Sequence, residues 1–339
     1  MVQTSVLAHA KWFVDWSMPF PTDWRFMAVP AAIAMVGGVG GLAAVWIVAT
    51  RRAGIPDLPD HRLFAWLQPR LPRIAAASLG IVLFALAANN RFLAPHQPLD
   101  QPEGWVIALI EGLVGIWLIV GLRLRQAAAA VGVLALVGLA VEGPVAILEA
   151  AHMWGIAWFL WLAAATDRPA AGGGWQLGVP GLRLGVGVAL VAGGLSEKLM
   201  NPALTRAVLD THPAMNLPQM LGLGIDMATY IRFMGSAELL LGLLIIVGVT
   251  PRLVALATAA PFVATVPLFG FTELFGHLPF YGALLVLLTC GSTGQPLPTI
   301  SLRRRAPAPR PHPQPATTAD VGASTTAPEE VTACVKAGD

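Results

Sequence analysis

The sequence predicts an all-α, polytopic membrane protein with nine transmembrane helices. Of its 339 residues, 56% are hydrophobic and only 12% are charged, whereas soluble domains carry about 25% charged residues. The mean hydropathy is +0.68. Apolar runs close to the roughly 20 residues needed to cross a bilayer recur along most of the chain. We therefore expect the lipid bilayer to surround most of this protein.

The composition argues against several classes of function. The net charge of +2 is small and the basic residues form short clusters at helix ends, a pattern that indicates membrane topology, so no nucleic-acid partner is expected. Cys290 and Cys334 are far apart and form no CxxC pair, which argues against a dithiol redox centre or a disulfide framework. The chain has no nucleophile elbow, no cofactor fingerprint and no convincing haem-ligand pair. We expect it not to be catalytic on its own.

The nine expected helices are rich in Ala, Leu, Val and Gly, and few contain a charge. Their expected ranges are 27–50, 73–94, 105–124, 126–145, 150–166, 181–199, 228–249, 251–269 and 278–295. Within the first of them, the small residues of GGVGG at 37–41 are typical of close helix packing.

The two flanks of this helical region differ in composition. Residues 1–26 are rich in Trp and Phe, which favours a segment lying at the extracytoplasmic membrane interface. The alternative is that a soluble partner protein binds this segment. Residues 303–339 are Pro, Ala, Thr and Arg with almost no large apolar side chains. They predict a disordered cytoplasmic tail.

Basic residues predict the orientation. They cluster at every second loop, as Arg51, Arg52, Arg62, Arg70, Arg73, Arg123, Arg125, Arg168, Arg183, Arg252 and Arg303 to Arg305. By the positive-inside rule, the N-terminus is extracytoplasmic and the C-terminus cytoplasmic, which agrees with an odd number of spans. A bacterial inner or plasma membrane is the expected location.

An internal repeat divides the chain. Residues 111–125 read EGLVGIWLIVGLRLR and residues 238–252 read ELLLGLLIIVGVTPR, with seven of 15 positions identical at an offset of 127. Upstream, NRFLAP at 90–95 matches EKLMNP at 197–202 at an offset of 107, so the second half has gained about 20 residues. Each repeat holds four helices, and an even number predicts two tandem four-helix bundles in parallel orientation, with helix 27–50 outside the duplication.

This four-helix unit resembles the DoxX-like family. Two features give the resemblance: a first helix that ends in Glu197-Lys198, and a second helix of the form E-x-x-x-G-x-x-L/I-x-x-G that runs from Glu238 to Arg252. The resemblance covers 73–166 and 181–295, and the second copy is the closer match. It implies a membrane protein linked to redox enzymes, as is the small subunit of a thiosulfate:quinone oxidoreductase.

The charged residues inside the helices are the candidate pocket. Each repeated glutamate lies 14 residues from an arginine at the cytoplasmic boundary, which places it about 9 Å below the outer boundary. A carboxylate at this depth needs a partner. We expect Arg91 to pair with Glu111, and Lys198 with Glu238. Two interpretations stay open: a structural ion pair, or a proton-handling or substrate-binding site. The pocket residues are Glu238, Glu197, Lys198, Glu111, Arg91 and Asn90.

A second set of residues suggests metal chemistry. Glu149-x-x-His152 places both side chains on one helical face, as metal ligands of helical bundles often are, and His277 follows Glu273 in the second half. These residues raise extracytoplasmic copper handling as an alternative function.

The leading hypothesis is an accessory subunit of an oxidoreductase complex, with quinone as its possible cofactor and other membrane subunits as partners. A quinone site needs an apolar slot with one or two polar groups. The alternative of a different class is an assembly subunit with no site of its own.

Overall fold

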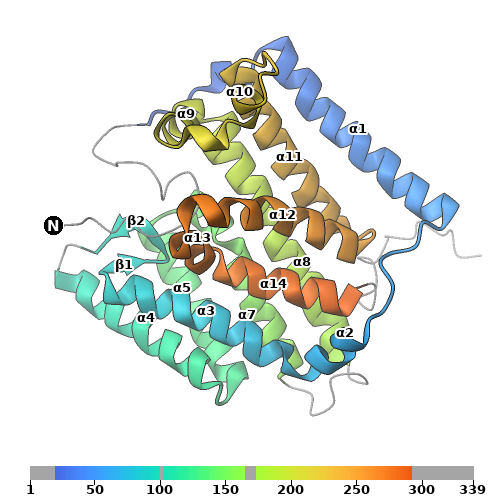
Figure 1. Cartoon of the computed structure of the whole chain (residues 1–339). Coiled ribbons are helices and arrows are strands. Elements are labelled where there is room, and N and C mark those ends of the chain that lie inside the picture. The colour runs from blue at the N-terminus through green and yellow to red at the C-terminus, as the bar shows by residue number, and fades with distance from the viewer. Residues whose placement is uncertain (1–19, 100–101, 165–172, 292–339) are drawn as a thin grey trace, which may run out of the picture. The chain divides into compact units, whose positions relative to one another are not determined.

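The computed structural model describes residues 20–99, 102–164 and 173–291. In these ranges the protein is almost entirely helical, as the sequence predicts, with one two-stranded hairpin of β1 (Arg91–Phe92) and β2 (Ala94–Pro98). The nine main helices of the described ranges are α1 (Pro30–Ala53), α3 (Leu71–Ala88), α4 (Pro102–Val120), α5 (Leu124–Val141), α7 (Ala151–Ala163), α8 (Gly173–Gly193), α11 (Met227–Val247), α12 (Pro251–Phe269) and α14 (Leu278–Cys290). Each of the nine predicted ranges therefore contains a helix (Figure 1).

These helices differ in whether they are long enough to cross a bilayer. In the described ranges, six helical segments are long and apolar enough to span a bilayer: 30–53, 62–88, 124–141, 177–199, 227–247 and 251–269. Three further apolar helices are shorter, at 104–120, 151–163 and 278–290. By helix length and composition the chain is an integral membrane protein. In the described residues, six of the nine predicted spans are long apolar helices and three are shorter ones.

Two of the short helices are continuations of broken helices. α6 (Pro144–Glu149) precedes α7 with one intervening residue, and α13 (Phe271–Gly276) precedes α14 in the same way. Each pair covers about 20 residues, which is the length of one span at 1.5 Å per residue. Breaks of this kind are tolerated at membrane depth where protein surrounds the backbone. They place Glu149 and His277 at the two breaks.

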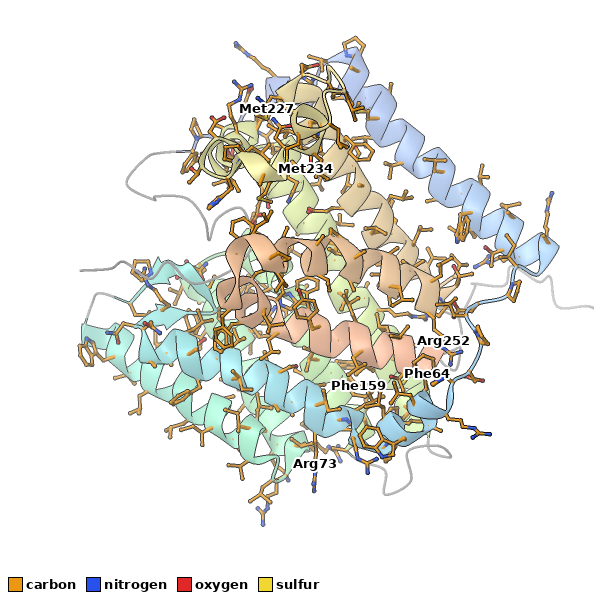
Figure 2. All side chains as sticks on the ribbon, viewed as in Figure 1. Phe64, Arg73, Phe159, Met227, Met234 and Arg252 are labelled. Carbon is orange, nitrogen blue, oxygen red and sulfur yellow. The ribbon has the colours of Figure 1, made fainter. Side chains whose placement is uncertain are left out.

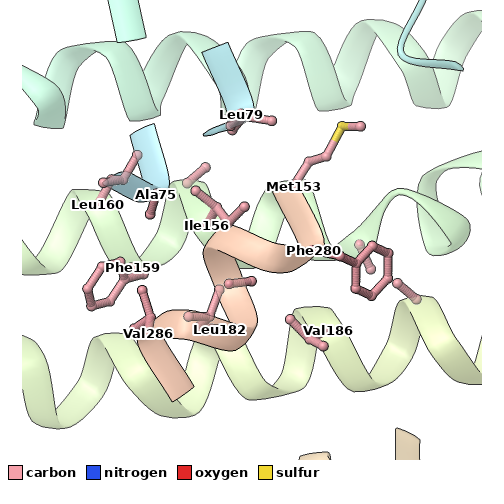
Figure 3. Close-up of a cluster of buried hydrophobic side chains, with 14 of the residues drawn as sticks. Ala75, Leu79, Met153, Ile156, Phe159, Leu160, Leu182, Val186, Phe280 and Val286 are labelled. Carbon is pink, nitrogen blue, oxygen red and sulfur yellow. The ribbon is translucent and has the colours of Figure 1, made fainter. Parts of the chain in front are cut away.

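We call α3, α4, α5 and α7 the first set of helices and α8, α11, α12 and α14 the second set. In the first set α3 packs on α4 and α5 on α7; in the second set α8 packs on α11 and α12 on α14. The sets meet where α7 packs on α8 and α14 packs on α3. Figure 3 shows the core at this junction, where Leu79, Ile156, Leu182 and Phe280 come from four different helices and are almost completely buried.

Close glycine contacts hold the helix pairs together. A Cβ atom on Gly242 of α11 would lie 2.7 Å from the carbonyl oxygen of Gly187 on α8, and Gly115 of α4 stands in the same relation to Gly80 of α3. Backbones approach this closely only where side chains are absent, as in other membrane helix pairs.

Replacement of Gly242 by leucine should therefore force α8 and α11 apart. We expect a loss of about 1–3 kcal/mol in the free energy of unfolding, the usual cost of overpacking. Thermal unfolding of the detergent-solubilised protein measures this loss. Gly132→Leu is the matched control because a Cβ atom at Gly132 has no atom within 4 Å. Equal destabilisation by both variants would contradict the close contact.

α1 lies outside both sets and packs along α11 (Figure 1). Its buried residues are Ala32, Val39 and Ala43. Val36 packs against the cluster formed by Val39, Leu199 and Leu239. A Cβ atom added to any of the four glycines of GGVGG would have no neighbouring heavy atom within 4 Å. The expectation that these glycines mark close packing is therefore wrong for the described residues, because Val39 makes the contact in their place.

The inserted segment of the second half folds into short helices. α9 (Pro202–Thr211) and α10 (Leu217–Met220) precede α11. Asp226 caps α11 by accepting hydrogen bonds from the Thr229 hydroxyl at 2.7 Å and its backbone N–H at 2.9 Å. These hydrogen bonds hold the pKa of Asp226 below its ordinary value.

Two predictions about the flanks lie largely outside the described residues. The interfacial segment 1–26 is described only from Phe20, where Trp24–Phe26 forms a 3-10 turn. The tail 303–339 lies wholly outside the described residues.

Arg183 has a position that the sequence does not predict. The range 181–199 would place it at a helix end, but α8 already begins at Gly173 and continues through Pro180. Arg183 is consequently inside the helix, 1% exposed, against Gly248 at the end of α11. A proline within a membrane helix is tolerated when neighbouring groups satisfy the freed carbonyl, so Pro180 does not start a new helix here.

Arg252 connects the segment before α3 to the second set of helices. Its guanidinium donates to the carbonyl oxygens of Leu58 at 2.7 Å and Leu288 at 3.1 Å and pairs with Asp60. Its carbon Cζ lies 5.0 Å from the ring centroid of Phe64. Both residues are labelled in Figure 2. One buried side chain therefore joins a loop, α12 and α14.

Candidate functional site

A π-helix marks the centre of the candidate site. Residues Gly194–Leu199 continue α8 with π-helical hydrogen bonding and carry Glu197 and Lys198. Single π turns inside longer helices often occur at functional sites, because the wider turn moves side chains out of the regular helical positions. The sequence predicts a helix here but gives no signal for the wider turn.

The predicted pair of Lys198 and Glu238 is present. Lys198 Nζ lies 2.8 Å from Glu238 Oε1, with 13% and 28% of the two side chains exposed. Gly194 faces Glu238, and a Cβ atom on Gly194 would lie 3.5 Å from Oε2. The absence of a side chain at Gly194 thus lets the carboxylate reach the π-helix.

Two further carboxylates act on the same lysine. Glu197 is 1% exposed, and Glu149 is 7% exposed at the break between α6 and α7. The charges of Glu238, Glu197 and Glu149 all interact with Lys198. The Ser196 hydroxyl donates a hydrogen bond to Glu149 Oε1 and so connects the two sets of helices. We call Glu149, Ser196, Glu197, Lys198 and Glu238 the lysine cluster.

Glu111 has a different environment from Glu238. It is completely buried, and its Oε1 accepts a hydrogen bond of 3.0 Å from the backbone N–H of Leu93. Its Oε2 has no hydrogen-bond partner among the described residues. The expected ion pair with Arg91 is wrong: Arg91 begins the β1 strand opposite Pro98, and Asn90 before it is exposed. The hairpin turns the backbone, rather than a basic side chain, toward the carboxylate.

The second broken helix holds a carboxylate–histidine pair. Glu273 Oε1 lies 2.8 Å from His277 Nδ1 and accepts a hydrogen bond of 2.6 Å from the Thr265 hydroxyl. Glu273 and His277 are 2% and 5% exposed. The ring of Phe262 lies 4.2 Å from the His277 ring, centroid to centroid. This buried pair connects α12, α13 and α14.

The three residues suggested as metal ligands do not converge. Glu149 belongs to the lysine cluster, His152 stacks on Phe280 with ring centroids 4.1 Å apart, and His277 pairs with Glu273. Among the described residues there is no group of three or more His, Cys, Asp or Glu side chains that could hold a metal ion.

An open apolar groove lies between α3 and α4. Its volume is about 320 Å³. Asn90 is the polar side chain in a lining that otherwise consists of Phe84, Ala87, Ala88, Trp105, Ala108, Leu109, Gly112, Leu113 and Ile116. Sequence reasoning placed Asn90 in the pocket beside Glu111, but it lines this groove instead, and Glu111 does not.

Sequence reasoning missed Ser196 and Thr265, and it placed Glu149 in a different site. Small hydroxyl residues in apolar helices are common, and nothing in their spacing marks them as partners of a carboxylate. The one available signal was Glu149 itself, a charge inside an apolar stretch that has to be satisfied.

Comparisons with known proteins found no match: no protein-family model, no curated protein and no solved structure matches this chain.

Proposed function

We propose that this integral membrane protein is an accessory subunit of a redox, quinone-linked membrane complex, and that the lysine cluster is its functional site. The observation that carries the proposal is the meeting of three carboxylates and one ammonium group inside apolar helices. Charged side chains at membrane depth are costly and usually mark ion or proton pathways. The resemblance of Glu197-Lys198 and Glu238 to the DoxX-like pattern points to redox partners.

The charges of the cluster favour proton handling. Glu149, Glu197 and Glu238 bring three acidic groups to one basic group, Lys198. An uncompensated charge in an apolar surrounding is strongly unfavourable, so the cluster balances its charge by binding protons or a cation. Quinone reduction takes up two protons with two electrons, and a partner enzyme would need such a source or acceptor of protons.

The groove between α3 and α4 is lined by apolar side chains, by the amide of Asn90 and by the indole of Trp105, whose N–H is a hydrogen-bond donor. It therefore meets the general requirement of an apolar slot with one or two polar groups. Lys198 does not line it, so a quinone bound there would not contact this lysine. In this proposal the quinone used by the complex is bound with residues of the partner.

We also propose that the two sets of helices are duplicated units related by an axis along the membrane normal. The broken helices support this, because α13 and α14 begin and end 127 residues after α6 and α7. The turns support it too: Gly121 and Gly248 have φ of 73° and 71°, and Arg123 and Thr250 have φ of 49° and 43°.

The junction between the sets supports the same relation. A Cβ atom on Gly155 would meet Leu182 and Gly185 of α8. Gly282, 127 residues later, would meet Ala75 and Ser78 of α3, which precede Leu182 and Gly185 by 107 residues. Each unit thus presents its fourth helix to the first helix of the other, as two-fold related units do.

The proposed orientation places the lysine cluster near the extracytoplasmic face. Arg252 lies where α11 ends and α12 begins, and it contacts the loop at 57–60. Arg51 and Arg52 lie in the last turn of α1, shortly before that loop. An excess of arginine at one membrane face is typical of the cytoplasmic side.

The test is purification from native membranes of the wild-type chain and of Glu238→Gln. We expect the wild type to co-purify with a redox enzyme whose quinone reduction depends on the chain. Glu238→Gln should leave assembly intact and lower turnover at least tenfold, because a neutral amide cannot exchange protons. Exposed Gln126→Glu is a control for a charge change elsewhere. A wild type with neither a redox partner nor quinone-linked activity would refute the proposal.

A structural role is the second candidate. The Lys198–Glu238 pair joins the π-helix to α11, and this is where a purely structural ion pair would lie. That function predicts the opposite result for Glu238→Gln: the complex is lost, and any complex that does assemble has normal turnover.

A further inference from the structure

The corresponding faces of the two helix sets differ in what covers them. In the first set, the face between α3 and α4 is the open groove, where Phe84 and Leu113 are 45% and 56% exposed. In the second set, α1 packs on α11, and its Val36 and Val39 share a cluster with Val191 of α8. The comparison rests on the duplication proposed above.

The covered residues correspond to groove residues position by position. Leu239 and Leu240 of α11 pack in one cluster with α1, Val191 of α8 and Leu195 of the π-helix. At the offsets of 127 and 107, their counterparts are Gly112, Leu113, Phe84 and Ala88, and all four line the groove.

The covering element is a single apolar helix. α1 presents Ala32, Val36, Val39 and Ala43 along its packed side, at spacings of four, three and four residues. Such spacing forms one stripe along a helix, with small and β-branched residues that allow close approach. Its sequence from Pro30 to Thr50 contains no charged residue.

The groove differs from its counterpart in shape. Gly112 and Ala88 stand where the second set has Leu239 and Leu195, whereas the larger Phe84 stands where it has Val191. A helix docked in the groove would therefore meet small residues at Gly112 and Ala88 and the phenyl ring of Phe84.

We propose that the groove between α3 and α4 is the docking site for one transmembrane helix of a different membrane protein, seated as α1 is seated on α8 and α11. The partner helix is uncharged across the bilayer and presents a stripe of small and β-branched residues at three- and four-residue spacing. It leaves the lysine cluster uncovered, so docking and the chemistry of that cluster are separable.

Photo-crosslinking in native membranes tests this proposal. The probe is p-benzoylphenylalanine, placed one at a time at Leu109 and Leu113 in the groove. The control position is Leu136 on α5, which is 68% exposed and does not line the groove. Sequencing of the adducts identifies the crosslinked residues.

We expect both groove positions to crosslink to one transmembrane helix of one other protein, at residues three or four apart, and Leu136 to give no such adduct. Ala88→Trp should lower the yield at Leu113 at least tenfold, because an indole at this exposed position is bulkier than Leu195, which α1 packs against at the corresponding position, and it fills the groove.

Three results would overturn the proposal: adducts only with lipids or isoprenoids, adducts with a second copy of this chain, or equal yields at Leu109, Leu113 and Leu136. The crosslinks do not depend on the lysine cluster, so Glu238→Gln should leave them unchanged. A positive crosslink with an inactive or absent redox partner would refute the proposed function while preserving this inference.

Discussion

Replacement of Arg252 by alanine is expected to lower the free energy of unfolding by about 3–5 kcal/mol, because two backbone carbonyl oxygens lose hydrogen bonds to a charged donor, each contributing about 1.5–3 kcal/mol. Arg252 is 7% exposed, and its guanidinium donates to the carbonyl oxygens of Leu58 and Leu288. Alanine would leave both acceptors and the Asp60 carboxylate without these bonds and would empty the space beside Phe64. Chemical denaturation in detergent measures the effect.

Two variants separate charge from geometry at this position. Arg252→Lys keeps the charge but cannot reproduce the planar fork, so we expect an intermediate loss. Arg125→Ala changes the corresponding residue of the first repeat, which is exposed and stacks on Trp161 at 4.5 Å. An exposed cation–π contact contributes about 0.5–1 kcal/mol. A loss at Arg252→Ala no larger than that at Arg125→Ala would contradict the connecting role of Arg252.

The second large effect is expected from Lys198→Met. Methionine has a similar length, so packing is kept while the one ammonium group in contact with Glu238 is removed. Glu149 and Glu197 would then also lose their cation. We expect destabilisation of about 3–5 kcal/mol, because an uncompensated buried charge is left behind. Thermal unfolding at neutral pH provides the measurement.

The double variant Lys198→Met with Glu238→Leu is the control for this prediction. It removes both charges of the pair, so it should recover part of the lost stability. If the loss of stability in the double variant equals the sum of the losses in Lys198→Met and Glu238→Leu, the 2.8 Å contact does not couple the two residues energetically.

The helices were predictable because their signal is carried by long apolar runs. α12 begins and ends within one residue of its expected range, since a turn at Thr250 and a glycine at 270 bound the apolar segment. The start of α8 was not predictable in the same way. Pro180 and Gly181 resemble a helix start, but packing against α7 and α11 keeps the helix continuous from Gly173.

The site was predictable only where its residues are close in sequence or repeat. Lys198 and Glu238 followed from the repeated pattern, and their pairing is confirmed. The pairing of Arg91 with Glu111 failed because the hairpin at 91–98 reverses the chain there, and no short-range pattern revealed it. Glu149 joins Lys198 through the packing of α7 on α8, a contact between elements that only the folded chain brings together.

The packing of α14 on α3 has a consequence for the biogenesis of the protein. The first of the two sets is synthesised and inserted long before residue 278, yet the side of α3 that carries Ser78 packs on the last helix, α14. Until that helix leaves the translocon, Ser78 and the small residues beside it face lipid or an insertion factor in place of Gly282. Assembly therefore finishes at the C-terminal end of the helical region, and a ribosome that stops early releases a bundle with an open seam.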